Sequence, residues 1–243
     1  MVSHHDCPKI QDAYTLRCIP QVMGATLDAI WYAEDVLGVE MNSATDNPLF
    51  FPEDGKVISG GNFHGQPVAL AMDFLGLASH ELGSFSERRI ARLVDEKLSG
   101  LPAFLTRHGG VSSGLMVLQY VAASIVSENK VLVHPASADS IPTSANQEDH
   151  NSMGTIAAWK AREIVQNVRK IVAIEMITAA QGLDFIHLTS SPAIEKIRSV
   201  LRSKVAPLEE DRSLSHDVEN VAEMISRGVF VSAAESVCGF QRT

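Results

Sequence analysis

Three side chains near the start of the chain combine a carboxylate-binding group with a titratable phenol. Gln11, Tyr14 and Arg17 follow one another at intervals of three residues, directly before a long apolar segment. Arg17 carries a planar fork of N–H donors that pairs well with a carboxylate. Tyr14 can accept a proton near neutral pH if cationic neighbours stabilise its phenolate. The spacing fits residues that converge in an extended segment, and it also fits an ordinary capped helix start with Arg17 in a surface ion pair.

A second polar segment, much later in the chain, places an acid before another long helical stretch. Glu148 lies in the run Asn146–Gly154, where it could accept a hydrogen bond from a polar ligand or take a proton. The structural alternative is that Asp149, Asn151 or Ser152 caps the helix, with the acids complementing the helix dipole. Together the two polar segments indicate part of an active site for an amino acid, but not a whole one.

A glycine-rich loop, Gly60–Pro67, could let the backbone approach a ligand closely. It lacks the Lys-Ser/Thr ending of a phosphate loop, so we do not expect nucleotide binding. Phe63 in this loop is by default a core residue. No histidines have the spacing of metal ligands, so we expect no metal site. The histidines concerned are His64, His80, His134 and His150.

Long helices must position these residues, because apolar side chains recur at helical spacing and few segments alternate as strands do. The predicted helices cover about 16–37, 65–93, 111–133, 152–186, 193–204 and 216–227. Their apolar residues occupy more than one face and need several neighbours to cover them. The sequence therefore predicts an all-α, long-helix bundle, organised as a single domain over residues 1–243, that associates with other subunits.

Composition and charge narrow the class of protein further. The 20 basic and 29 acidic residues give a net charge of −9, which argues against a nucleic-acid surface. No uncharged apolar stretch is long enough to span a membrane, and Met1–Cys7 does not have the pattern of a signal peptide. The three cysteines lack metal or redox spacing. We therefore expect a cytoplasmic protein with reduced thiols.

With these segments in order, the chain resembles the aromatic amino acid lyase family, and within it the enzymes that deaminate histidine. The resemblance runs from Ser3 to about Gly228 and weakens after that. It implies the long-helix bundle that this family shares with fumarase-type enzymes. The matching segments are Gln11–Cys18, Pro20–Gly24, Asn42–Pro48, Ser59–Gly65, Ser86–Arg89, Ser127–Lys130 and Asn146–Gly154.

The resemblance implies the conversion of L-histidine to urocanate and ammonia, with a methylidene-imidazolone (MIO) prosthetic group as the electrophile. It implies that Arg17 binds the substrate carboxylate, that Gln11 helps shape the site and that Phe63 lines it. Tyr14 would lie beside the β-carbon as a proton-transfer candidate. Glu148 would contact the imidazole or act as the base, and the choice between it and Tyr14 stays open. The related phenylalanine and tyrosine lyases carry glutamine in place of Glu148, so the acid favours histidine.

The chain departs from the family in one respect. The prosthetic group forms from an internal Ala-Ser-Gly, and this sequence contains none. It resembles only the C-terminal half of the family, so we expect the chain alone to be inactive. The first hypothesis is a partner polypeptide that supplies the N-terminal half within a tetramer-like oligomer. The alternatives are a non-catalytic fragment that only oligomerises and a part of an aromatic amino acid aminomutase.

Overall fold

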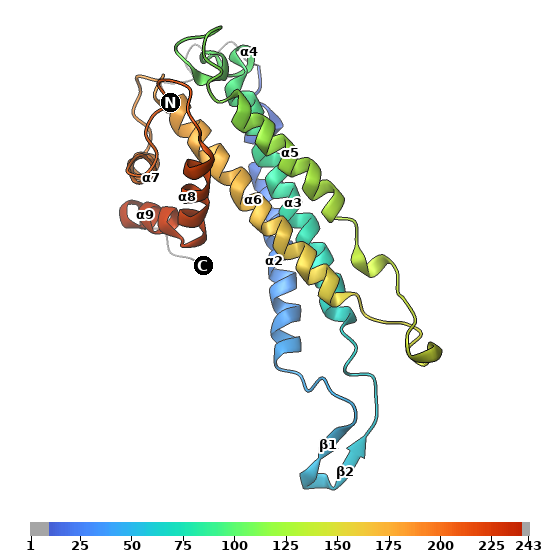
Figure 1. Ribbon diagram of the computed structural model, residues 1–243. Helices are drawn as coiled ribbons and strands as arrows, with labels where there is room; N and C mark the ends of the chain where they lie inside the picture. The colour runs from blue at the N-terminus through green and yellow to red at the C-terminus, as the bar shows by residue number, and fades with distance from the viewer. Residues whose placement is uncertain (1–9, 240–243) are drawn as a thin grey trace.

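The computed structural model describes residues 10–239, which are mostly helical. Met1–Cys7, which we did not expect to be a signal peptide, lies outside this range. Four long helices run along the molecule (Figure 1). They are α2 (Ile19–Met41), α3 (Gln66–Val94), α5 (Met116–Leu132) and α6 (Gly154–Leu183). The predicted all-α class is confirmed.

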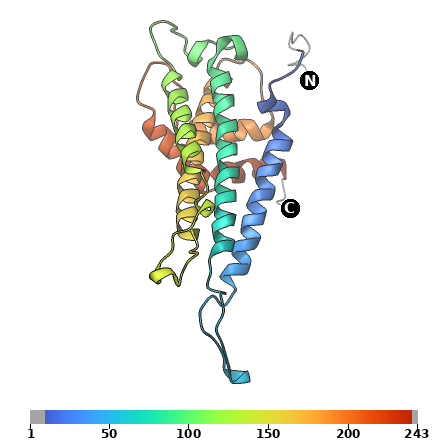
Figure 2. The ribbon, with the colours of Figure 1, turned by 90° about the vertical axis from the view of Figure 1, so that its right-hand side faces the viewer.

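Shorter elements complete the described residues. The short helices are α1 (Tyr14–Arg17), α4 (Glu96–Ser99), α7 (Pro192–Arg202), α8 (Ser215–Ser226) and α9 (Val229–Cys238). Single 3₁₀ turns are η2 (Pro52–Asp54), η3 (Ala103–Leu105), η4 (Ala136–Ala138) and η5 (Ser144–Asn146). Strands β1 (Leu49–Phe51) and β2 (Lys56–Ile58) form an antiparallel hairpin, with Phe50 opposite Val57. This hairpin projects beyond one end of the bundle (Figure 2).

Two predicted helix starts differ from the structure. The first predicted helix is divided at Cys18 into α1 and α2, because Pro20 has no N–H to continue α1 but suits the first turn of a new helix. The third predicted helix begins at Met116 rather than near residue 111. The carboxylate of Asp211 accepts hydrogen bonds from the backbone N–H groups of Ser113 and Gly114, at 2.7 and 2.9 Å. These bonds hold the preceding segment in a turn.

The centre of the bundle is the contact between α3 and α6. At Gly83 a side chain would meet Ile171 and Val168 at 3.1 Å, and at Gly76 it would meet Ile164 at the same distance. The absence of side chains at both glycines therefore lets the two helix backbones approach closely. Successive turns of α3 and α6 then bury their apolar residues against each other.

Two apolar clusters follow from this contact. The larger one joins α3, α5 and α6 to the short helices α7, α8 and α9 and includes Ile90, Leu118 and Ile174. The smaller one joins α2, α3 and α6 and rests on Ala33, Ala71 and the small residues around them. The larger cluster therefore fixes one end of α6, and the alanine-based cluster sets the close spacing of the three helices at the other end.

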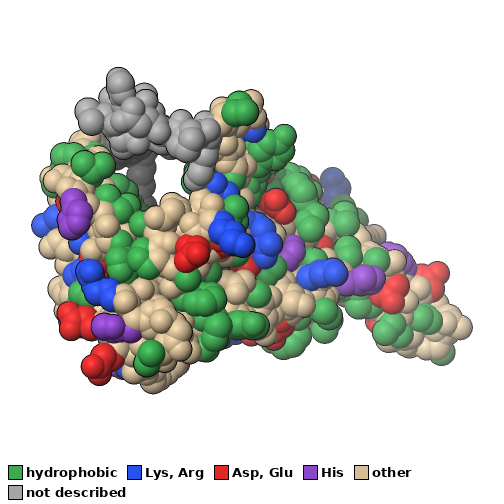
Figure 3. Space-filling view, turned by 90° about the horizontal axis from the view of Figure 1, so that it is seen from above, with side chains coloured by type: hydrophobic (Ala, Val, Ile, Leu, Met, Phe, Trp, Pro, Cys, Tyr) green, Lys and Arg blue, Asp and Glu red, His purple; other side chains and the backbone are tan. Residues whose placement is uncertain are grey.

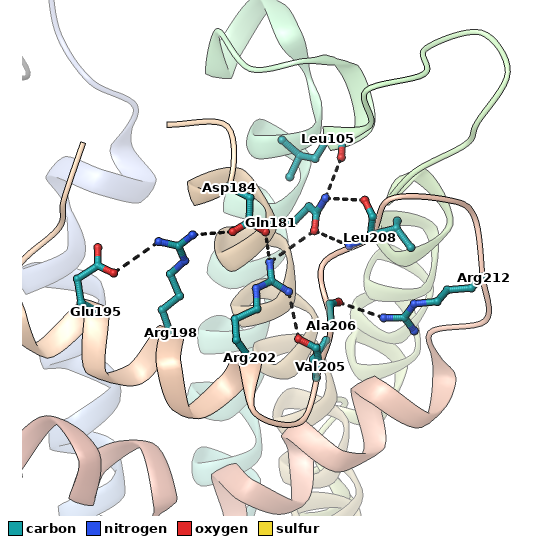
Figure 4. A network of polar contacts seen from close by, with 10 residues as sticks. All are labelled: Leu105, Gln181, Asp184, Glu195, Arg198, Arg202, Val205, Ala206, Leu208 and Arg212. Atoms are coloured by element: carbon teal, nitrogen blue, oxygen red, sulfur yellow. Dashed lines mark hydrogen bonds and ion pairs between the residues drawn. The ribbon is translucent and has the colours of Figure 1, made fainter. Parts of the chain in front are cut away.

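A polar network attaches α7 and the segment after it to the end of α6 (Figure 4). Asp184 accepts from Arg198 at 2.6 Å and from Arg202 at 2.5 Å. Gln181, only 4% exposed, accepts from the N–H of Leu208 and donates to its carbonyl, both at 3.0 Å. Burial of Arg202 lowers its pKa, and the hydrogen bond to Asp184 raises that of Arg198. The network satisfies polar groups that would otherwise be buried without partners.

Large apolar side chains remain exposed on the long helices. Trp31, Tyr120 and Trp159 are 51%, 66% and 57% exposed. Figure 3 shows hydrophobic side chains spread among charged ones on the face seen from above. Within residues 10–239, no helix is both long and apolar enough to cross a membrane.

Candidate functional site

Tyr14 and Arg17 form a joint unit in the single turn of α1. The guanidinium of Arg17 lies over the Tyr14 ring, 5.0 Å from its centroid. Arg17 Nε donates to the carbonyl of Asp12 at 2.8 Å, and both side chains are exposed, as is Gln11. The alternative interpretation of a capped helix start is wrong, because Ala13 precedes α1 without a side-chain cap. Among the described residues Arg17 also forms no ion pair. Tyr14 and Arg17 therefore present a phenol and a guanidinium side by side to solvent.

Glu148 projects from a turn that precedes α6. Thr143 Oγ1 donates to Glu148 Oε2, and the backbone N–H of Thr143 donates to the carbonyl of Glu148 at 2.9 Å. Hydrogen bonds from Thr143 and then Ser144 hold the pKa of the Glu148 carboxyl below its ordinary value, while desolvation opposes them. The carboxylate is exposed. It is therefore an ionised acceptor directed to solvent or to a ligand.

Of the three predicted caps of α6, Ser152 bonds to the helix start. The residue at the N-cap position itself is Met153, which makes no side-chain cap. Ser152 Oγ accepts from the N–H of Gly154 at 3.1 Å. Asn151 instead donates its amide to the carbonyl of Ile141 at 2.7 Å and to Thr143 Oγ1 at 3.0 Å. Asn151 therefore organises the turn that carries Glu148, and Ser152 satisfies the first N–H of α6.

The loop that carries Phe63 lies beside this turn. His64 Nε2 is 2.8 Å from the carbonyl of His150, and the two imidazole rings stack with centroids 5.7 Å apart and planes within 7°. A side chain at Gly65 would lie 3.1 Å from Ser152 Oγ. Phe63 itself is 55% exposed, so the default prediction of a core residue is wrong. The structure therefore brings the Phe63 loop and the Glu148 turn together, although their residues are more than eighty positions apart.

The two groups of predicted residues lie at opposite ends of the bundle. α1 lies at the beginning of α2, whereas the Phe63 loop follows the other end of α2 through the β1–β2 hairpin (Figures 1 and 2). The 23 residues of α2 correspond to roughly 34 Å at 1.5 Å per residue. One copy of the chain therefore cannot bring Tyr14 and Arg17 next to Phe63 and Glu148.

Other polar residues of this region were not singled out from the sequence. Asn47 Oδ1 accepts from the N–H of Gly60 at 2.9 Å and from Ser59 Oγ at 3.1 Å, and Asn62 donates to the carbonyl of Ala44. These bonds tie the glycine loop to the end of α2. The segment Asn42–Pro48 stood out in the sequence, but the residues that it bonds to could not be deduced without knowing the β1–β2 hairpin.

In the part of the chain that the structure describes, the two main cavities do not coincide with the predicted site residues, and no cluster of metal ligands is found. One cavity of about 520 Å³ lies between α5, α8 and the segment around Asp211, and one of about 530 Å³ lies between α2 and α3. Neither is lined by the five predicted site residues. Within residues 10–239, no group of three or more His, Cys, Asp or Glu is arranged to hold a metal ion. The candidate site therefore consists of two exposed half-sites.

A long-helix bundle with exposed polar residues at its two ends defines a mainly helical protein. Comparison with known proteins identifies its family. Residues 1–203 match the family described as aromatic amino acid lyase, and the chain belongs to that family.

Its relatives include histidine ammonia-lyases. The histidine ammonia-lyase of Symbiobacterium thermophilum is 60% identical over 95% of this chain, and that of Caldanaerobacter subterraneus subsp. tengcongensis is 62% identical over 90%. The chain covers 46% and 44% of those two proteins, so it spans less than half the length of the curated relatives it matches.

Solved structures show the same fold. A crystal structure of histidine ammonia-lyase from Trypanosoma cruzi has a TM-score of 0.90 and 50% identity, covering 93% of this chain and 45% of that one. A tyrosine aminomutase from Streptomyces globisporus has a TM-score of 0.92 and 42% identity, covering 96% of this chain and 45% of that one. The fold is thus common to a lyase and an aminomutase, and the identities are higher for the histidine ammonia-lyases.

Proposed function

We propose that the chain is the C-terminal part of a histidine ammonia-lyase, which removes ammonia from L-histidine without oxidation to give urocanate. The observation that carries this proposal is the 60% identity to a histidine ammonia-lyase over 95% of the chain. In this reaction the Cα–N bond breaks, a proton leaves the β-carbon, and an alkene and ammonia result. The reaction therefore needs a group that binds the carboxylate, a proton acceptor and a contact for the imidazole ring.

The residues of this chain have the chemistry for those three tasks. Arg17 presents its guanidinium fork to the substrate carboxylate, and exposed Gln11 helps shape the site beside it. Tyr14, under the Arg17 guanidinium, takes the β-proton as the general base. Glu148 receives the ring N–H, and Phe63 covers the substrate from the same loop region.

The MIO group of the family fits this arrangement as a group carried by another segment. The chain has no Ala-Ser-Gly from which to form the group. Tyr14 and Phe63 are exposed, so each can lie against an MIO group that another segment carries. When bound, the group supplies an electrophile that makes the substrate amine a better leaving group. The chain's own residues bind the substrate, orient it and move the β-proton. A segment that carries the Ala-Ser-Gly is therefore needed to complete the site.

The divided site favours an oligomer. The Arg17 and Glu148 half-sites lie roughly 34 Å apart along α2, so a complete site draws them from different copies, as in a tetramer-like assembly. The exposed side chains Trp31 and Trp159 lie on helices that such an assembly would cover. We place this assembly in the cytoplasm.

The test is reconstitution. The chain is coexpressed with a polypeptide that carries the Ala-Ser-Gly half, and urocanate formation from L-histidine is followed by ultraviolet absorbance. Activity in the complex, with neither chain active alone, supports the proposal. A stable complex that forms no urocanate from histidine would contradict it.

A complementation experiment tests the shared site. Arg17→Ala and Glu148→Gln each disable one half-site, so assemblies of either variant alone should be nearly inactive. When the two variants are mixed before assembly, a fraction of the sites combines an intact Arg17 from one copy with an intact Glu148 from another. Recovery of activity only in the mixture is the expected result. Absence of recovery in confirmed mixed assemblies would show that each site uses one copy.

An aminomutase is the second candidate, because the Streptomyces globisporus tyrosine aminomutase has the same fold. The two functions differ in their product: an aminomutase returns the amine to the β-carbon, whereas a lyase releases it. Analysis of the reaction mixture for a β-amino acid distinguishes them. Glu148 favours the lyase on histidine, since it suits a ring N–H donor that tyrosine lacks.

A further inference from the structure

The turn that carries Glu148 has an uncommon backbone. Ser144, Ala145 and Asn146 occupy the left-handed region in succession, with φ of 50°, 53° and 67°. None of them is glycine, so each is held in a conformation that L-residues rarely adopt. Thr143 and Glu148 close the turn, with the N–H of Thr143 donating to Glu148 O at 2.9 Å and the N–H of Glu148 to Thr143 O at 3.4 Å. Such backbone is retained where the surrounding contacts determine it, often at functional sites.

Thr143 links the closure of this turn to the acid. Its hydroxyl donates to Glu148 Oε2 at 2.5 Å and accepts from Asn151 Nδ2 at 3.0 Å. A threonine hydroxyl has one hydrogen. Because Asn151 occupies the acceptor side, that hydrogen is directed to the carboxylate.

Asn151 is itself held from several directions. Its side chain donates to Ile141 O at 2.7 Å, and its backbone N–H donates to Ser140 Oγ at 2.6 Å. The neighbouring His150 carbonyl is bonded to His64, which adjoins Phe63. The hydrogen bonds therefore run from the Phe63 loop through Asn151 and Thr143 to the carboxylate of Glu148.

We propose that Thr143, oriented by Asn151, is a positioning residue that fixes the Glu148 carboxylate as the acceptor for the ring N–H of an imidazole substrate. This assignment rests on the proposed function and deepens it. It gives Glu148 the role of binding the ring and leaves the β-proton to Tyr14. Thr143 acts through Glu148 and does not touch the substrate.

The electrostatics agree with a binding role. The hydrogen bonds from Thr143 and Ser144 lower the pKa of Glu148, and a carboxylate with a lowered pKa is a weaker base near neutral pH. The same carboxylate is a good acceptor, because hydrogen bonds to an ionised group are stronger than those between neutral groups. The turn therefore favours hydrogen bonding over proton abstraction at this position.

The test uses the reconstituted assembly and steady-state kinetics with L-histidine. Thr143→Val keeps the branched shape and removes the hydroxyl, and Thr143→Ser restores the hydroxyl. The matched control is Thr155→Val, at an exposed threonine in the first turn of α6. Urocanate, which carries the same ring, serves as a competitive ligand.

For Thr143→Val we expect KM and the urocanate inhibition constant to rise together by about ten-fold, the scale of one hydrogen bond to a charged group. The kcat should change by less than about three-fold, Thr143→Ser should return both constants to near wild type, and Thr155→Val should change neither. Thr143→Ala serves as a second variant if the valine variant does not assemble.

Two results would overturn this inference while leaving the proposed function intact. One is an active Thr143→Val assembly with unchanged KM and inhibition constant. The other is a loss confined to kcat, which would assign the turn to proton transfer. A wild-type complex that forms no urocanate would instead overturn the proposed function, and this assignment with it.

Discussion

Gln181 is the position at which the structure gives the clearest expected loss of stability. Its side chain lies in the last turns of α6, is 4% exposed and bonds to both backbone groups of Leu208 at 3.0 Å. A weaker contact reaches the carbonyl of Leu105 at 3.4 Å. Substitution Gln181→Met keeps nearly the same volume and removes these hydrogen bonds. The N–H and carbonyl of Leu208, which is itself buried, would then have no partner from α6.

The size of the effect follows from the two strong bonds. Each buried backbone group left unsatisfied costs about 1–3 kcal/mol, so two such groups cost about 4 kcal/mol at the middle of that range. Methionine fills the space, so little is added for a cavity. For a chain of this length, 1 kcal/mol shifts the melting temperature by about 2–4 °C, which gives a fall of roughly 8–16 °C.

Urea and thermal unfolding, followed by circular dichroism at the helical band, measure this change. The matched control is Gln166→Met, a half-buried glutamine earlier on α6, which should change stability by less than about 0.5 kcal/mol. A loss below about 1 kcal/mol in Gln181→Met would refute the reasoning. It would mean that water or a shift of the segment around Leu208 replaces the lost bonds.

Two further predictions concern α3. Gly83→Val places a side chain 3.1 Å from Ile171 and Val168 and should cost about 1–3 kcal/mol in urea unfolding, whereas Gly38→Val, with no neighbour within 4 Å, should not show this packing loss. Burial lowers the pKa of His80 from its ordinary 6.5, against the opposing charge of Glu81, so its contribution to stability is complete above that value and declines as the pH falls below it. His80→Leu should therefore reduce the loss of stability between about pH 7 and about pH 5, and an unchanged pH dependence of unfolding would contradict this origin.

The long helices were predictable because their apolar residues repeat at helical spacing over many turns. The predicted range 65–93 differs from α3 by one residue at each end, and 152–186 contains α6. The β1–β2 hairpin was missed because its strands have only three residues each, too few to show alternation. α9, with ten residues, was also missed.

At the candidate site, residue type was predictable and surroundings were not. The types of Tyr14 and Arg17 indicated their chemistry, but the stacking of the guanidinium on the ring depends on the single turn of α1. Phe63 was assigned to the core by default because an isolated aromatic residue usually packs there. Thr143 gave no signal, because its bond to Glu148 requires a left-handed turn built without glycine. The sequence did not reveal contacts that depend on an unusual backbone conformation or on residues distant in the chain.

The exposed apolar faces and the divided site are consequences of the same geometry. α2 separates the Arg17 half-site from the Glu148 half-site by roughly 34 Å, and no motion within a rigid helix shortens that distance. If two copies pack with their long helices antiparallel, the beginning of α2 in one copy lies near the end of α2 in the other. Such packing buries apolar residues along the helices, and Trp31 and Trp159 are exposed there. In such a two-fold arrangement each copy would give and receive the same surface, so burial of one face would complete two of the proposed sites at once. We therefore infer that association of the helices and assembly of the site are one event, and that a variant weakened in the first loses the second.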